Sequence, residues 1–154
     1  ELRYLPDTVL NAFNEHGWKL VIDHAYTAKM GKLYNVSCTG VTSYQERTIY
    51  VSEAGAVLHE FGHFIEGELL SFPARSQELF NAEAKDAPFR SYAKTSSSEY
   101  FADYFAYLLT HSDGSKSMQL LKKSTPKTYE YFHSLTINGE PLLGGSHAEE
   151  VKNY

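Results

Sequence analysis

The spacing of hydrophobic residues in the first part of the chain predicts one helix followed by three strands. Between Leu5 and Gly17 apolar residues recur at helical spacing, and the glycine is a suitable helix end. Trp18–Ile22 is a compact apolar run that contains valine and isoleucine, which is typical of a strand. Two further strands are predicted over Tyr34–Thr42 and Arg47–Ser52, with a turn at Ser43–Glu46 between them.

From Glu53 to about Leu70 the hydrophobic period changes from two residues to about 3.6, which predicts a long amphipathic helix. The rest of the chain has a mainly helical pattern, with helices expected over Ser76–Ala84, Ser96–Leu109, Lys116–Lys123 and Thr125–Leu135. The chain therefore predicts an α+β fold: a small mixed sheet of about three to four strands, packed on the helix that begins near Glu53, followed by a mainly helical C-terminal part. We expect a single domain over residues 1–137 and a loosely ordered tail over residues 138–154.

The composition limits the classes of function. With 14 Lys and Arg against 19 Asp and Glu, the chain lacks the basic excess of a nucleic-acid binder, so no nucleic-acid partner is expected. No apolar stretch approaches the length of a membrane span. The one cysteine, Cys38, excludes an internal disulfide and a cysteine-based zinc cluster, and its strand-like surroundings favour a buried structural thiol.

The strongest chemical signal is the segment His59-Glu60-Phe61-Gly62-His63, which falls within the predicted long helix. Residues four positions apart on a helix lie about 40° apart around its axis, so both imidazoles can converge on one ion. Zinc binds imidazole nitrogens at about 2.0–2.1 Å, and we expect His59 and His63 to be two of its ligands. Glu60 lies at the flank of this pair, where its carboxylate is suited to act as the general base toward an attacking water.

A catalytic zinc site takes three protein ligands, and Glu99 is the best candidate for the third. It shares a polar helix face with Asp103, one turn on, which is suited to accept the second ring N–H of a ligating histidine. Each acid also has a purely structural interpretation. Glu99 completes a capping box with Ser96, and Asp103 could be a solvated surface acid.

Together with the segment Tyr92–Asp103, the motif at His59–His63 resembles the catalytic domain of anthrax lethal factor and its relatives, which include the secreted bacterial Pro-Pro endopeptidases. The resemblance implies a zincin-like fold, one Zn²⁺ per chain and a glutamate ligand from a later helix, here Glu99. It also implies that Tyr92, seven residues earlier, assists catalysis. Asp103 stands where lethal factor itself is expected to have a glutamate.

These features predict a zinc-dependent endopeptidase that hydrolyses an extended peptide or protein substrate. Pro-rich substrates are among those expected. Substrate is expected to lie beside the strand at Arg47–Ser52. Secretion from a bacterium is favoured over a cytoplasmic location, and a monomer is expected. Three alternatives are an intracellular HExxH peptidase that acts on a repressor, a catalytically inactive peptide-binding module of a toxin-like protein, and a structural zinc site. The other histidines are expected on the surface or in the core: His16, His24, His111, His133 and His147.

Overall fold

The computed structural model describes residues 2–33 and 39–144. Its α-helices are α1 Asp7–Glu15, α2 His24–Leu33, α3 Val57–Phe64, α4 Ala74–Glu83, α5 Ser97–Thr110, α6 Lys116–Ser124 and α7 Pro126–Ser134. Its strands are β1 Lys19–Ile22, β2 Gly40–Ser43, β3 Thr48–Val51, β4 Thr136–Ile137 and β5 Glu140–Pro141. Shorter turns of 3₁₀ helix are Leu2–Tyr4, Ala54–Ala56, Ala84–Asp86 and Ser91–Lys94, and Ile65–Leu69 is a π-helix.

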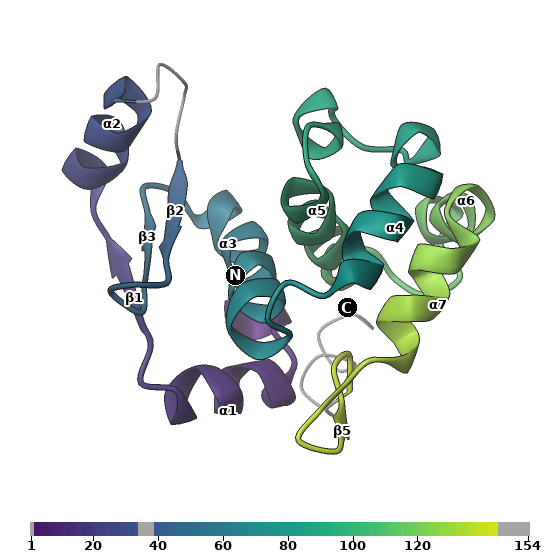
Figure 1. Ribbon diagram of the computed structural model, residues 1–154, viewed down its shortest axis with the longest axis horizontal. Coiled ribbons are helices and arrows are strands. Elements are labelled where there is room, and N and C mark those ends of the chain that lie inside the picture. Colours follow the sequence, from purple (N-terminus) through teal and green to yellow (C-terminus); the bar gives the residue numbers. More distant parts are fainter. Residues whose placement is uncertain (1, 34–38, 145–154) are drawn as a thin grey trace.

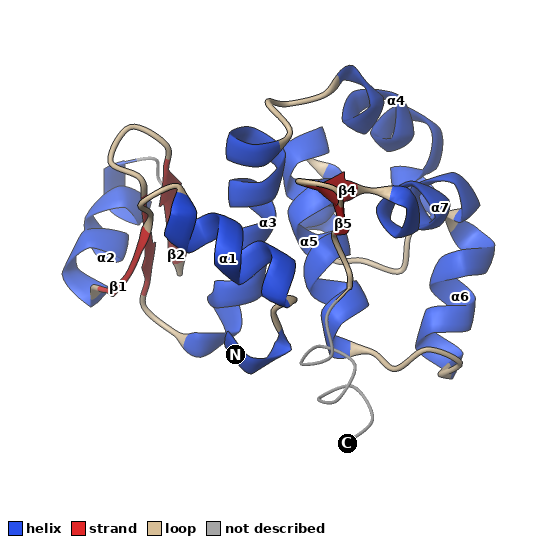
Figure 2. Ribbon diagram, turned by 90° about the horizontal axis from the view of Figure 1, so that it is seen from below, coloured by secondary structure: helices blue, strands red, loops and turns tan. Residues whose placement is uncertain are grey.

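The α+β architecture is confirmed, with α3 at its centre (Figure 1). On one side α3 packs against β2 and β3, and on the other it packs against α5. Helix α2 covers the opposite face of the sheet, where Tyr26 stacks on Tyr50 of β3 with 3.9 Å between ring centroids. Helices α4, α6 and α7 complete the C-terminal part, as Figure 2 shows from a second direction.

The main sheet has the strand order β1-β3-β2. Strands β1 and β3 are parallel, with Lys19 opposite Thr48, and β2 and β3 are antiparallel, with Gly40 opposite Val51. Strand β3 is hydrogen-bonded on both sides, so the edges of the sheet are β1 and β2. Of these two edge strands, β2 packs against α3. The expected strand over Tyr34–Thr42 is described only from its C-terminal end, and Cys38 lies outside the described residues.

The segment from Glu53 to Leu70 is helical, as expected, but the type of helix changes along its length. A 3₁₀ turn leads into α3, and the π-helix follows it directly. The core side of this unit is fully buried, with Phe61, Phe64 and Ile65 at 0% exposure. Phe13 of α1 packs against Phe61 with ring centroids 4.5 Å apart, so α1 closes the core from the N-terminal side. Burial of these apolar side chains fixes the orientation of the opposite, polar face of α3.

Helices α3 and α5 approach each other closely at Gly62. A Cβ atom at this position would lie 2.6 Å from the Cα of Ala102. Only two small residues at the crossing allow the two backbones to come this near. Helix α5 begins with a capped turn in which the Ser96 hydroxyl accepts a hydrogen bond from the Glu99 N–H at 3.2 Å.

The N-terminus of α7 is capped from another helix. Pro126 occupies the first turn, as its sequence position suggests, but Thr125 makes no side-chain cap. The buried Glu83 of α4 instead accepts hydrogen bonds from the backbone N–H groups of Lys127 and Thr128 at 3.0 and 2.7 Å. This carboxylate joins α4 to α7 and satisfies N–H groups that the start of a helix leaves unpaired.

The first residues of the expected tail belong to a hairpin. Strands β4 and β5 form a hairpin through Asn138 and Gly139, which have φ angles of 53° and 81°. Positive φ at both central positions is the requirement of a tight hairpin turn, and Asn-Gly meets it. Leu142 follows and is fully buried, so it anchors the end of the hairpin to the domain, while residues 145–154 lie outside the described part.

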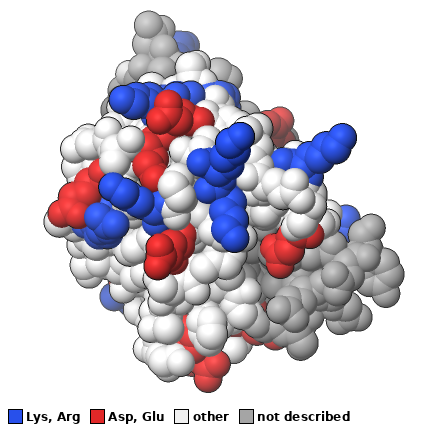
Figure 3. All heavy atoms as spheres, turned by 90° about the vertical axis from the view of Figure 1, so that its right-hand side faces the viewer, with Lys and Arg blue, Asp and Glu red and all other residues white. Residues whose placement is uncertain are grey.

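Charged side chains of both signs are interspersed on the face that Figure 3 shows. The whole chain carries a formal charge of −5. Of the helices in the described ranges, none combines the length and the apolar character needed to cross a bilayer.

The close approach at Gly62 leads to a stability prediction. We expect Gly62→Ala to lower the free energy of unfolding by about 1–3 kcal/mol, because the added methyl forces α3 and α5 apart. Urea unfolding in the presence of a chelator measures this without any contribution from bound metal. Gly55→Ala is the matched control, since a Cβ there meets nothing within 4 Å. Equal stability of the two variants would contradict the packing described here.

Candidate metal centre

Helix α3 presents His59, Glu60 and His63 on the side away from its apolar core face. His59 and Glu60 are 8% and 6% exposed, and the imidazole centroids of His59 and His63 are 4.8 Å apart. One potential ligand atom from each of the three residues lies within 4.8 Å of the other two. The i, i+4 spacing thus brings the two histidines together as the sequence predicted, with the glutamate beside them.

Glu99 reaches the same place from α5. Its Oε2 lies 2.9 Å from His59 Nε2, and its Oε1 lies 3.2 Å from His63 Nε2. Only the serine half of the expected capping box forms: the backbone N–H of Glu99 donates to the Ser96 hydroxyl, while the Glu99 carboxylate contacts the two histidines instead. Burial raises the pKa of Glu99, but hydrogen bonds from the two histidines outweigh burial and hold the pKa well below its usual range.

Asp103 lies one turn further along α5 and holds the other nitrogen of His59. Its Oδ1 contacts His59 Nδ1 at hydrogen-bond distance, so the aspartate is not a solvated surface acid. Burial lowers the pKa of His59, yet the bonds to Asp103 and Glu99 and the charge of Glu60 raise it to about 9. The surroundings of this imidazole therefore favour positive charge.

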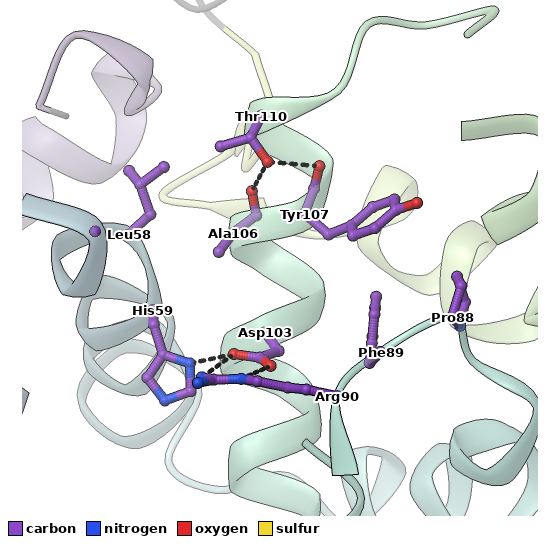
Figure 4. Close-up of a pocket in the computed structure, with 10 residues that line it drawn as sticks. Leu58, His59, Pro88, Phe89, Arg90, Asp103, Ala106, Tyr107 and Thr110 are labelled. Atoms are coloured by element: carbon purple, nitrogen blue, oxygen red, sulfur yellow. Dashed lines mark hydrogen bonds and ion pairs between the residues drawn. The ribbon is translucent and has the colours of Figure 1, made fainter. Parts of the chain in front are cut away.

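Arg90 holds Asp103 in turn, a contact that no pattern in the sequence indicated. The Nε of Arg90 donates to Asp103 Oδ2 at 2.9 Å and one terminal nitrogen donates to Oδ1 at 3.0 Å (Figure 4). A guanidinium with two parallel bonds to one carboxylate is a rigid arrangement. Figure 4 shows Asp103 joined by dashed hydrogen bonds to both His59 and Arg90. All three residues line a cavity of about 450 Å³.

Strand β2 supports Glu60 from the other side. The hydroxyl of Thr42 donates to Glu60 Oε1 at 2.8 Å. A Cβ at Gly40 would lie only 2.7 Å from the Cγ of Glu60, so a larger residue would displace the carboxylate. Glu60 Oε2 lies 4.0 Å from His59 Nε2, further than the Glu99 oxygen. The Glu60 carboxylate therefore lies beside the histidine pair, whereas the Glu99 carboxylate contacts the Nε2 atoms of both His59 and His63.

Tyr92 stands at the rim of the site. Its side chain is 50% exposed, and its ring centroid is 6.3 Å from that of His59. The Arg90 guanidinium lies over the Tyr92 ring at 5.2 Å, a cation–π contact that orients the ring. Burial and the nearby charge of Glu99 raise the pKa of Tyr92 to about 12, so its hydroxyl stays protonated near neutral pH.

These side chains open into a cavity of about 330 Å³. His59, Glu60, His63, Glu99 and Tyr92 all line it. Its other walls come from α2, β2, the turn between β2 and β3, the loop after the π-helix and the first turn of α5, through Met30, Gly40, Val41, Thr42, Tyr44, Phe72 and Ser98. A cavity of this size beside polar groups that converge on one point can admit a small segment of a ligand.

The donor set fits a zinc ion. Two ligands bound to tetrahedral zinc at about 2.0–2.1 Å are about 3.3 Å apart. The Glu99 oxygens are 2.9 and 3.2 Å from the two imidazole nitrogens, so these donors already lie near that spacing. Two imidazoles and one carboxylate are a ligand set that zinc takes in catalytic sites.

The other described histidines have local partners or lie at the surface. His16 contacts Glu68 at 3.3 Å, and His111 and His133 stack on Tyr107 and Tyr129. His24 is exposed at the start of α2. His147 lies outside the described residues.

The bond between Arg90 and Asp103 can be tested through metal affinity. Arg90→Lys keeps the positive charge but loses the two-pronged bond, so Asp103 should hold His59 less firmly. We expect Zn²⁺ affinity to fall about tenfold, within the range usual for groups that orient a metal ligand. Arg75→Lys is the control, because Arg75 forms an exposed ion pair with Glu78 on α4. Unchanged affinity in Arg90→Lys would mean that Asp103 is oriented without the guanidinium.

Comparison with known proteins identifies one family. The family model described as "Anthrax toxin lethal factor, N- and C-terminal domain" matches residues 1–135. A search of curated proteins found no match. The matched range contains α1 to α7, including the site on α3 and α5.

Proposed function

Because the chain belongs to the anthrax toxin lethal factor family, we propose that it is a zinc-dependent endopeptidase. The observation that carries the proposal is the convergence of His59, His63 and Glu99, with Glu60 beside them at the wall of an open cavity. The family description includes an N- and a C-terminal domain, so membership alone does not determine the activity. Catalysis is proposed from the side chains of the site.

The proposed ligands of one Zn²⁺ per chain are His59, His63 and Glu99. When bound, zinc supplies Lewis-acid chemistry, lowering the pKa of water and polarising a carbonyl group. Asp103 and Arg90 act behind the ligands. They keep His59 Nδ1 in a hydrogen bond, so that Nε2 faces the site.

Glu60 is the proposed general base. Its carboxylate accepts a proton from the water that attacks the scissile carbonyl and then delivers a proton to the leaving amine. The Thr42 hydroxyl holds one of its oxygens, which leaves the other facing the cavity. Tyr92 is the proposed donor to the oxyanion that develops on the carbonyl, since its hydroxyl remains protonated at neutral pH.

The substrate is proposed to be an extended segment of a peptide or protein. We expected it beside Arg47–Ser52, but β3 is paired on both sides and offers no edge. The edge strand next to the cavity is β2, and three of its residues line the cavity: Gly40, Val41 and Thr42. A peptide that adds to β2 as a further strand would pass over Glu60.

The main alternative is a peptide-binding module without catalytic activity. The family description supports this alternative, because it includes an N-terminal as well as a C-terminal domain. Against it, Glu60 is retained and is held by Thr42 and by the space at Gly40, a support that a binding module does not need. A structural zinc site is disfavoured because the three proposed ligands border an open cavity.

The compartment and assembly remain proposals of the same kind. Membership of a toxin-related family favours a secreted protein over the alternative of a cytoplasmic peptidase that acts on a repressor. We propose one peptidase domain over residues 1–137, acting as a monomer. The hairpin that ends at Leu142 packs on this domain.

Glu60→Gln tests the proposed function directly. The change keeps the size of the side chain but removes the base, so peptide hydrolysis should fall by at least about 100-fold while zinc uptake persists. The measurement is digestion of a peptide library followed by mass spectrometry, with metal content determined in parallel. Glu53→Gln is the control, because Glu53 is exposed outside the cavity.

Two results would count against the proposal. Undiminished hydrolysis by the zinc-loaded Glu60→Gln variant would exclude Glu60 as the base. A wild-type protein that binds zinc and peptides but cleaves none of the library would favour the inactive binding module.

Tyr92→Phe tests the proposed oxyanion donor. Removal of one such donor typically lowers kcat by about 100- to 1,000-fold. We expect most of the loss in kcat and little in KM, because the hydrogen bond forms mainly in the transition state. Tyr129→Phe on α7 is the control and should behave as wild type. A loss confined to KM would make Tyr92 a substrate-binding residue.

A further inference from the structure

A second cavity adjoins the metal centre at His59. Its volume is about 450 Å³, and it is lined by His59, Arg90 and Asp103 together with apolar side chains. His59 is the one residue that also lines the cavity containing Glu60. We propose that this second cavity binds a small carboxylic acid with an apolar body, whose carboxylate pairs with Arg90. The proposal rests on the proposed function in one respect, the effect of zinc on the affinity.

The apolar walls of the second cavity are fixed by packing. Leu58 of α3 is 2% exposed. Phe89, in the loop before α5, packs against the rings of three tyrosines of α5 with centroid distances of 5.3, 5.6 and 5.9 Å. Figure 4 shows Leu58 and Phe89 on opposite sides of Ala106. Walls that are in place before a ligand arrives bind it without the cost of ordering their own side chains.

Arg90 has hydrogen-bonding capacity left for a ligand. A guanidinium carries N–H groups on three nitrogens. Asp103 accepts from Nε at 2.9 Å and from Nη2 at 3.0 Å, whereas Nη1 forms no hydrogen bond within the described part of the chain. The Arg90 side chain is 61% exposed and lines the second cavity. Its Nη1 can therefore donate to a second carboxylate while Asp103 keeps the first two bonds.

The lining residues define the chemical class of the ligand. Arg90 is the only lysine or arginine among the ten residues that line the second cavity, and Asp103 stands beside it. One cation next to one carboxylate favours a singly charged anion over a phosphate dianion, which Asp103 would repel more strongly. Leu58, Phe89 and the other apolar walls suit an aliphatic or aromatic body. The volume lies within the range of small-molecule sites, roughly 300–1,000 Å³.

Zinc should strengthen the binding of such an acid. With neutral imidazoles, the carboxylates of Glu60, Glu99 and Asp103 and the guanidinium of Arg90 leave a formal charge of −2, which repels an incoming anion. A bound Zn²⁺ would cancel this charge. Coupling between two ligands is reciprocal, so the acid should raise the affinity for zinc by the factor by which zinc raises the affinity for the acid.

Calorimetric titration of the zinc-loaded protein with 3-phenylpropionate tests the proposal, and 3-phenylpropanol is the matched ligand without a charge. We expect the acid to bind at least about tenfold more tightly than the alcohol, because its carboxylate pairs with Arg90. Metal-free protein should bind the acid about tenfold more weakly than zinc-loaded protein does. At saturating zinc, Arg90→Gln should bind acid and alcohol equally. Arg75→Gln is the control, because Arg75 lies outside the cavity in an exposed ion pair.

Ala106→Leu locates the binding site. The larger side chain fills the second cavity, and Ala106 does not line the cavity that contains Glu60. Binding of the acid should fall by about tenfold or more while zinc uptake persists. Thr110→Phe, at an exposed position in the same lining, replaces this variant if Ala106→Leu does not fold.

Three results would overturn the proposal or part of it. Unchanged binding of the acid by the folded cavity-filling variant would mean that the carboxylate binds zinc itself. Equal binding of acid and alcohol by the wild type would remove the role of Arg90. Equal binding of the acid with and without zinc would exclude the coupling. A protein that takes up no zinc would end the proposed function alone, since the acid should still bind more tightly than the alcohol and lose this advantage in Ala106→Leu.

Discussion

The crossing of α3 and α5 at Gly62 and Ala102 is the constraint on which the site depends. A Cβ at Gly62 would come within 2.6 Å of the other helix, so the distance between the two helices is set by the absence of a side chain. At this distance Glu99 reaches both imidazoles and Asp103 reaches the far side of one. Apolar burial on the other face of α3 prevents the helix from turning away.

The charges around this crossing are unbalanced without a cation. Three carboxylates, those of Glu60, Glu99 and Asp103, surround the two histidines, and one guanidinium, that of Arg90, offsets one of them. With neutral imidazoles this leaves a formal charge of −2 in a half-buried place. The raised pKa of His59 has the same origin. A divalent cation, as proposed, would neutralise the cluster.

Local spacing predicted the parts of the site that lie on single helices. The histidine pair and Glu60 follow from one turn of α3, and the shared face of Glu99 and Asp103 follows from one turn of α5. Arg90, 13 residues before Asp103, and Thr42, 18 residues before Glu60, belong to separate elements and have no spacing rule. Tertiary packing alone brings them to the site.

Other differences have similar physical causes. The strand beside which substrate was expected, Arg47–Ser52, is not at an edge of the sheet, because β1 pairs with it from a distant part of the sequence. The hairpin after α7 did carry a local signal, the pair Asn138-Gly139, which makes the turn, and Leu142 anchors it in the core. The glycines and prolines nearby had suggested a loose tail.

The most direct test of this account is a crystal structure of the zinc-soaked protein with anomalous data at the zinc edge. The account predicts one peak per chain, at about 2.0–2.2 Å from His59 Nε2, His63 Nε2 and a Glu99 oxygen. Glu60 should stand beside the ion without binding it. A protein that takes up no zinc, or an ion bound without Glu99, would contradict it.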